Sequence, residues 1–176
     1  MLAVTAGCGG DESTLTIYLK QRLGSDGPPG QITPVLTPVE RERRSGVSSA
    51  CQAGLFVRQG PAPGEWGQGF LETLRPGTRL RAVSVERSVA TVRLAGKEPD
   101  LYGSAAIFYS LTSLPGIDGV RILLDGAPCC VYSHAGRPIE TLTEDTFAGW
   151  QGEPCELRVQ TDAVRCRAGA RRTLRP

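Results

Sequence analysis

The stretch that decides the fold opens as Pro76-Gly-Thr-Arg-Leu-Arg-Ala-Val-Ser-Val85 and continues through Val89-Ala-Thr-Val-Arg-Leu94. A helical segment follows, and then Leu114-Pro-Gly-Ile-Asp-Gly-Val-Arg-Ile-Leu-Leu-Asp-Gly126, which leads to Pro128. The order strand, turn, strand, helix, strand predicts the centre of a small layered domain.

Local signals place the helix and the strands of this stretch. Asp100 is a typical N-cap residue, and apolar residues follow it at the helical period (Leu101, Ala105, Phe108, and Leu111 or Thr112). Residues 120–124 are apolar on both faces, which predicts a central strand. Arg87-Ser88 joins the first two strands without the Asn-Gly or Asp-Gly that tight hairpins favour. We therefore expect a looser turn or mild strain there.

Three further elements are expected before residue 60. Residues 14–19 alternate polar and apolar, which predicts a half-buried strand. Residues 32–39 read as an edge strand, because Pro34 and Pro38 lack donor N–H groups. Residues 47–59 predict a helix, which Ser45 or Ser48 could cap. Its expected packing face is a stripe of small and apolar residues (Val47, Ala50, Cys51, Gly54 and Leu55).

Composition narrows the class of protein. A chain of 176 residues with 40% hydrophobic residues fits one domain with tails. The formal net charge of +2 is too small to predict nucleic-acid binding, which needs a concentrated basic footprint. Five arginines close the chain (Arg165, Arg167, Arg171, Arg172 and Arg175), and we expect a frayed tail or a contact with an anionic surface.

The N-terminus predicts a lipid anchor. Thr5-Ala-Gly-Cys8 places small residues before a cysteine, as in the cleavage box of bacterial lipoproteins, and Gly9-Gly-Asp-Glu-Ser13 reads as a polar tether. A complete export signal also needs a positive segment and an apolar run of about 7–15 residues, so residues 1–13 predict a clipped signal and tether. We expect acyl chains on Cys8, which would hold the protein at the extracytoplasmic face of the cell membrane.

The remaining cysteines leave the disulfide pattern open. Five remain (Cys51, Cys129, Cys130, Cys155 and Cys166), and an odd number leaves at least one free or intermolecular thiol. Cys155 and Cys166 bound a predicted short hairpin, and a bridge between them would staple it. In the alternative, one of these two pairs with Cys129 or Cys130.

The sequence displays no catalytic apparatus. His134 is the single histidine, and Ser133 beside it is no evidence for a triad, which is recognised by geometry. Cys129, Cys130 and His134 lack the paired spacing usual for zinc. We expect no catalytic residues, no metal and no cofactor.

Five segments in order resemble the GerMN domain family, which is named from a sporulation and spore-germination protein. They are residues 69–80, 83–85, 89–92, 109–116 and 124–128. The turn departs from the family in having Ser88 where glycine is usual, and Arg93 stands where an acidic residue is usual.

The resemblance implies an α+β fold, with one mixed β-sheet and two helices packed on one face. Such a fold is similar to the ring-building-motif domains of secretion systems. A short C-terminal β-hairpin extension is expected beyond it. The resulting division is 1–13 signal and tether, 14–128 GerMN-like domain, and 129–176 extension. The family also implies a bacterial envelope lipoprotein with no enzymatic activity.

Two hypotheses for function follow. In the first, a lipid-anchored envelope protein, with a possible sporulation or germination role, uses its domain to bind an unknown envelope protein or to self-associate. An exposed sheet edge or helix face would make that contact. In the second, Trp66 and Trp150 bind a small ligand or a cell-wall glycan.

Overall fold

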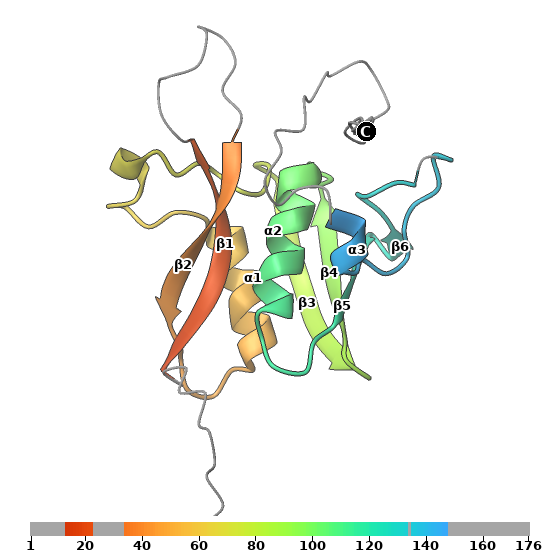
Figure 1. Cartoon of the computed structure of the whole chain (residues 1–176), viewed down its shortest axis with the longest axis horizontal. Coiled ribbons are helices and arrows are strands. Elements are labelled where there is room, and N and C mark those ends of the chain that lie inside the picture. The colour runs from red at the N-terminus through yellow and green to blue at the C-terminus, as the bar shows by residue number, and fades with distance from the viewer. Residues whose placement is uncertain (1–12, 23–33, 134, 148–176) are drawn as a thin grey trace, which may run out of the picture.

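The computed structural model describes residues 13–22, 34–133 and 135–147. Helices α1 and α2 lie side by side between a β-hairpin and a four-stranded sheet (Figure 1). The elements are β1 (Thr14–Arg22), β2 (Pro34–Glu42), α1 (Ser49–Gln59), η1 (Trp66–Gln68), β3 (Thr78–Glu86), β4 (Val89–Gly96), α2 (Leu101–Thr112), β5 (Gly119–Leu124), β6 (Ala127–Pro128) and α3 (Glu144–Phe147).

The α+β class with a mixed sheet is confirmed. Strands pair in the order β3-β4-β5-β6, with β4 and β5 parallel and the other pairs antiparallel. Helix α1 contacts β3 and α2 contacts β5. Strands β1 and β2 form a separate two-stranded sheet across the helices, which was not expected.

Strand β1 follows the predicted alternation. Leu15, Ile17 and Leu19 are buried and point into the helix layer. Its antiparallel partner β2 carries Pro34 and Pro38 and borders no other strand of the described chain, which confirms the expected edge position.

Helix α1 starts where expected, but its buried face matches the predicted one only at Ala50 and Gly54. Ser48 caps it by accepting a hydrogen bond from the backbone N–H of Cys51. Val47 and Leu55 are exposed, at 42% and 40%. The helix must contact β1, α2 and β3 at once, and its buried residues instead include Ala53 and Val57.

Helix α2 is capped by Asp100, whose side chain accepts a hydrogen bond from the N–H of Gly103. The helix is buried nearly all round, as is typical of an element between two apolar layers. A Cβ on Gly103 would meet Leu74 at 2.9 Å and the Thr73 carbonyl oxygen at 3.0 Å, so this approach requires glycine.

The hairpin turn between β3 and β4 is tight, not loose. Arg87 and Ser88 both have positive φ, at 49° and 64°. Non-glycine residues rarely adopt this conformation, so the expected strain is present while the expected loop expansion is not.

The core continues past residue 128, where the domain was expected to end. Cys129, Val131, Leu142 and Phe147 are buried in the same hydrophobic cluster as the helices. Leu142 also forms an isolated antiparallel bridge with Val120 of β5. The predicted hairpin around Cys155 and Cys166 lies outside the described residues.

Replacing Ile122 tests the packing of β5. Ile122 is 2% exposed and faces the helices, so Ile122→Ala is expected to lower the free energy of unfolding by about 2–5 kcal/mol. Leu123→Ala, on the opposite face and partly exposed, is the matched control and should cost less. Denaturant melts measure both, and a loss below about 1 kcal/mol for Ile122→Ala would contradict its place in the core.

Replacing Ser88 tests the strain in the turn. Glycine adopts positive φ without a Cβ clash, so Ser88→Gly should raise the free energy of unfolding by about 1 kcal/mol. Ser84→Gly, inside β3, should instead lower it by about 0.5–1 kcal/mol. Thermal melts that rank the two variants the other way would show that the turn stores no strain.

Candidate functional site

Several residues singled out from the sequence lie outside the described residues. These are Cys8, His134, Trp150, Cys155, Cys166 and the five C-terminal arginines. The acyl anchor and the Cys155–Cys166 staple therefore stay predictions.

The structure joins Cys129 and Cys130 to each other in a disulfide between adjacent residues. Both side chains are 7% exposed. This pairing differs from the alternative in which one of them bonds to Cys155 or Cys166, because each sulfur already has a partner. Cys51 is the free cysteine of the described residues and is partly exposed.

Local backbone geometry brings the two sulfurs together. Consecutive side chains of an extended segment normally point to opposite faces. Cys129 still follows the sheet, since its N–H donates to the carbonyl of Ile122, but Cys130 has a φ of +82°. This left-handed residue interrupts the alternation.

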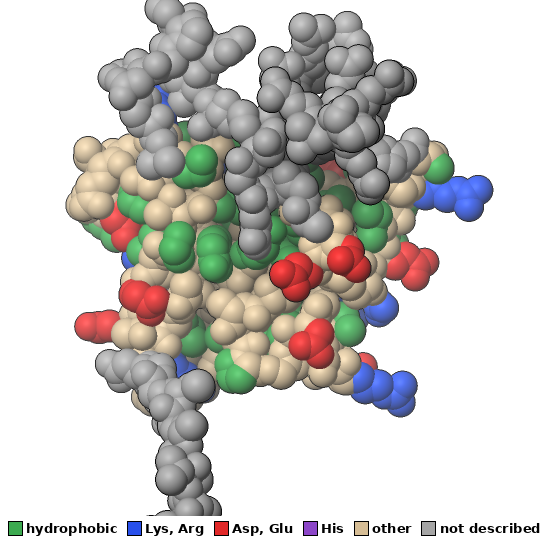
Figure 2. Space-filling model, in the orientation of Figure 1, with side chains coloured by type: hydrophobic (Ala, Val, Ile, Leu, Met, Phe, Trp, Pro, Cys, Tyr) green, Lys and Arg blue, Asp and Glu red, His purple; other side chains and the backbone are tan. Residues whose placement is uncertain are grey.

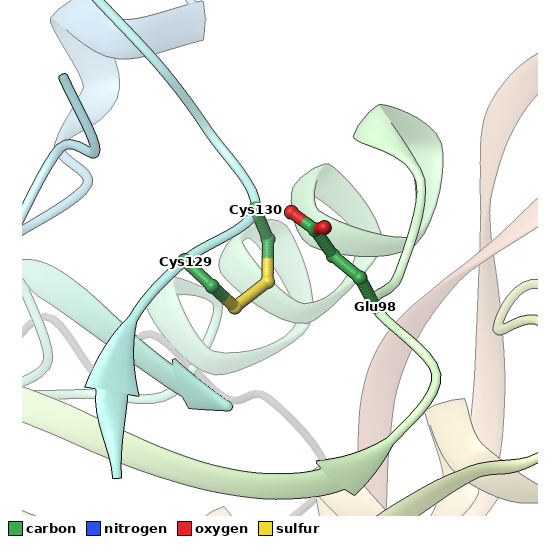
Figure 3. Close-up of side chains that lie close together, drawn as sticks. All are labelled: Glu98, Cys129 and Cys130. Carbon is green, nitrogen blue, oxygen red and sulfur yellow. A yellow bond between two sulfur atoms is a disulfide. The ribbon is translucent and has the colours of Figure 1, made fainter. Parts of the chain in front are cut away.

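Glu98 faces this pair from the segment between β4 and α2 (Figure 3). One carboxylate oxygen of Glu98 and the two sulfurs all lie within 4.8 Å of one another. Two sulfur atoms and a carboxylate are chemically suited to a thiophilic metal once the cysteines are reduced. The Cys-Cys pair is visible in the sequence, but its neighbour Glu98 is separated from it by α2 and β5 and was missed.

Tyr132 also contacts the Glu98 carboxylate. Its hydroxyl donates a hydrogen bond of 3.1 Å to Glu98 Oε1. Desolvation, then this bond and the charge of Glu98, raise the pKa of Tyr132 above its ordinary value of 10.0. The contact orients the carboxylate without consuming both of its oxygens.

The second candidate site is the free edge of β3. Among the described strands β3 pairs only with β4, and a β-bulge lies between Leu80 and Ala82. Beyond the bulge, residues 82–86 present an uninterrupted backbone edge. Unpaired edges are templates for another strand, and bulges and charges commonly protect them. Here the bulge and Arg81 lie in the first half of the strand, and Glu86 is the one charged residue of the second half.

The edge of β1 shows the contrast. On the side away from β2, the N–H of Tyr18 donates to Ser110 Oγ and the N–H of Lys20 donates to Thr73 Oγ1. The N–H of Arg22 donates to the carbonyl of Gly69. The edge of β1 is therefore closed between Thr16 and Arg22, in contrast to the second half of β3.

Apolar side chains border the free half of β3. Val85 is 44% exposed at the end of the strand. Leu55 of α1 and Val47, which precedes this helix, are exposed, and the partly buried Cys51 lies between them at a spacing of four residues. Gly54 of the same helix lies against Val83. We call residues 82–86 with Val47, Cys51 and Leu55 the edge surface.

Trp66 belongs to a different region. It starts η1 and is 48% exposed. Its neighbour Glu65 makes a double contact with Arg41 of β2, at 2.7 and 2.6 Å, which fixes this segment on the hairpin. An open depression is bordered by Ser13 and residues 43–47, and Trp66 is not among its lining residues.

The surface charge is mixed. In Figure 2, acidic side chains lie across the middle of the visible face, beside hydrophobic ones, while Lys and Arg lie towards its margins. This face presents no concentrated basic patch of the kind that nucleic-acid binding uses. None of the described helices has the length and apolar character needed to cross a bilayer.

The fold defines a class of small α+β domains with paired helices against a mixed sheet, and known structures share it. The tandem GerMN domains of the sporulation protein GerM from Bacillus subtilis superpose with a TM-score of 0.57 at 19% identity, over 80% of this chain and 48% of that one. The first GerMN domain of the same protein gives 0.52 at 16% identity, over 75% and 98%. This chain thus spans about half the length of the tandem protein.

Residues 16–130 match the Germane family, described as "Sporulation and spore germination". The chain belongs to this family, and the resemblance to GerMN domains predicted from five sequence segments is confirmed. No curated protein matches the chain.

The Arg41–Glu65 pair gives a pH-dependent prediction. The hydrogen bond from Arg41 lowers the pKa of Glu65 below its ordinary value of 4.5. A carboxyl with a lowered folded pKa stabilises the fold fully above its unfolded pKa, and loses that effect as the pH falls through the folded value. Glu65→Gln should thus cost about 1 kcal/mol at neutral pH, allowing for solvent screening.

Urea melts from pH 7 down to pH 3 check this expectation. The difference between wild type and Glu65→Gln should be constant above pH 4.5 and shrink below it. Glu42→Gln, on the exposed end of β2, serves as the control and should track wild type throughout. A Glu65→Gln difference that does not change with pH would mean that the ion pair is not its cause.

Proposed function

We propose that this protein is a non-enzymatic, lipid-anchored cell-envelope protein whose GerMN domain binds another envelope protein through the edge surface. The observation that carries the proposal is the open second half of β3, bordered by exposed apolar side chains. The Germane family and the sporulation protein GerM also support a role in sporulation or germination.

Strand addition is the mode of binding that this surface fits best. An extended segment of the partner would pair with the backbone of residues 82–86, and its alternate side chains would contact Val85 and the exposed Leu55 of α1. Main-chain hydrogen bonds supply affinity in such complexes, and the apolar contacts supply specificity. The bulge at Leu80/Ala82 would set where the added strand ends.

The anchor determines where this binding takes place. Thr5-Ala-Gly-Cys8 supports acylation of Cys8, and residues 9–13 would separate the lipid from β1. Tethering confines the domain to a thin layer at the membrane, which raises its effective concentration for a partner in the same layer. The protein would then act by holding its domain at the membrane and not by catalysing a reaction.

A photo-crosslinking residue placed at Val85 or at Leu55 in the full-length protein tests the surface in the producing bacterium. One discrete crosslinked product is expected from both positions. Arg121, on the outer face of β5, is the control position and should give none. Val85→Glu should remove the product formed through Leu55, because a charge at the edge disfavours strand addition.

The outcomes distinguish the possible partners. A product with the mass of two chains would assign self-association, and a larger or smaller one would assign a different protein. Equal products from Val85, Leu55 and Arg121, or no effect of Val85→Glu, would contradict the edge surface. Separately, Cys8→Ser should abolish incorporation of a palmitate analogue and release the protein from the membrane fraction.

A further inference from the structure

The Cys129–Cys130 disulfide and Glu98 form a cluster that the proposed function does not use. We propose that reduction of this disulfide opens a binding site for a thiophilic divalent cation of the zinc class. Its ligands are Cys129 Sγ, Cys130 Sγ and the Glu98 carboxylate. The site does not depend on the edge surface or on the lipid anchor.

Distances are compatible with one cation held by all three groups. Zinc–sulfur bonds of about 2.3 Å at a tetrahedral centre hold two sulfurs about 3.7 Å apart, and a sulfur and an oxygen slightly closer. In the structure the three ligand atoms already lie within 4.8 Å of one another. Once the S–S bond is broken, rotation about the side-chain bonds suffices to reach this spacing.

The surroundings hold the ligands in place. The N–H of Cys129 is fixed to Ile122 of β5, and Val131 accepts a hydrogen bond from Ile139, so both flanks of the pair are tied to the fold. Tyr132 donates to Oε1 of Glu98, which orients the carboxylate as an outer-shell partner orients a metal ligand. Both cysteines are 7% exposed, so only a small opening of the site is needed for entry.

Reduction and binding are two balanced steps. A dithiol reductant gives two electrons and two protons to the S–S bond, which becomes two thiols while the reductant becomes a disulfide. A divalent cation then binds both sulfurs as thiolates and the carboxylate, and two protons leave to solvent. The disulfide form cannot make these bonds, because thiolates are the ligands. The site therefore binds a cation only when the Cys129–Cys130 disulfide is reduced.

The natural chain is tested first for the disulfide itself. Cleavage after glutamate leaves Cys129 and Cys130 as the only cysteines of the peptide 87–140. Without reduction, this peptide should be two hydrogens lighter than after reduction, and should resist alkylation. Alkylation of both cysteines without reduction, or a link to another peptide, would overturn the proposal.

Cation binding is then measured on the full chain with the other cysteines replaced (Cys8→Ser, Cys51→Ser, Cys155→Ser and Cys166→Ser). Titration with Cd²⁺ after reduction by a phosphine should give a thiolate-to-cadmium absorption band that saturates at one cation per chain. The same protein with its disulfide intact should give no band. Zn²⁺ in large excess should compete for the same site and lower the intensity of the band.

Three variants separate the roles of the ligands. Cys129→Ser and Cys130→Ser should each abolish saturable binding. Glu98→Gln should keep the band but weaken affinity by about tenfold or more, since even outer-shell changes have effects of that size. Glu86→Gln, at the exposed end of β3, is the matched control and should bind as the parent does. Circular dichroism confirms that each variant is folded.

The following results would contradict the proposed cation site. A reduced, folded parent that binds no Cd²⁺, or an oxidised parent that binds it equally, would overturn the proposal. Equal affinities for Glu98→Gln and Glu86→Gln would remove Glu98 from the site and overturn its three-ligand form. If a cysteine variant fails to fold, cadmium NMR of the reduced parent decides, because two sulfur ligands shift the resonance away from that of oxygen-only coordination.

Discussion

The rest of the structure depends on the packing of helices α1 and α2 between two sheets. Because of this arrangement, each helix must bury more than one of its sides. Small side chains make it feasible, because Ala53 and Ala105 are fully buried and Gly54 lets Val83 approach closely. Polar groups in this layer must also be satisfied, since an unpaired buried donor or acceptor costs about 1–3 kcal/mol. Ser110 meets this demand by accepting a hydrogen bond from Tyr18. The same contacts hold the β1–β2 hairpin away from the mixed sheet, so the chain forms two sheets and not one.

Because the hairpin is held by the helices and the 69–73 segment, the edges of the two sheets have different chemistry. The inner edge of β1 is closed by Ser110, Thr73 and Gly69. The outer strand β2 carries Pro34 and Pro38, which cannot donate. Strand β3 has a bulge next to Arg81, and beyond the bulge no other described strand pairs with its outer side. The outer edge of the second half of β3 is thus open because α1 and α2 pack against both sheets. This open edge is the reason to expect a partner there.

Local signals in the sequence predicted much of this fold. Asp100 before an apolar stripe predicted α2 and its cap, and the alternation around Ile17 predicted β1, because both depend on neighbours in sequence. The buried face of α1 was predicted only in part: Ala50 and Gly54 are buried as expected, but Val47 and Leu55 are exposed. Val47 and Leu55 fit one helical stripe as well as Ala53 and Val57 fit another. Only the positions of β1, α2 and β3 decide between them. For the Arg87-Ser88 turn the sequence left a looser turn or mild strain open, and the structure has the strained form. Strand pairing on both sides imposes a conformation that these two residues do not prefer.

The contact of Glu98 with the cysteine pair could not be predicted from the sequence. Adjacent cysteines were noticed, but their meaning depends on Glu98, which precedes α2 while the cysteines follow β5. Strands β4 and β5 are parallel and are connected through helix α2. The C-terminal end of β5 therefore lies beside the C-terminal end of β4. The carbonyl of Leu94 accepts the N–H of Asp125, which fixes the two strand ends next to each other. Strand β6 then turns back beside β5, and the N–H of Cys129 donates to the carbonyl of Ile122. The left-handed backbone of Cys130 completes the approach of the cysteine pair to Glu98. The chemistry of this site therefore depends on the crossover, on the short strand β6 and on one unusual backbone conformation together.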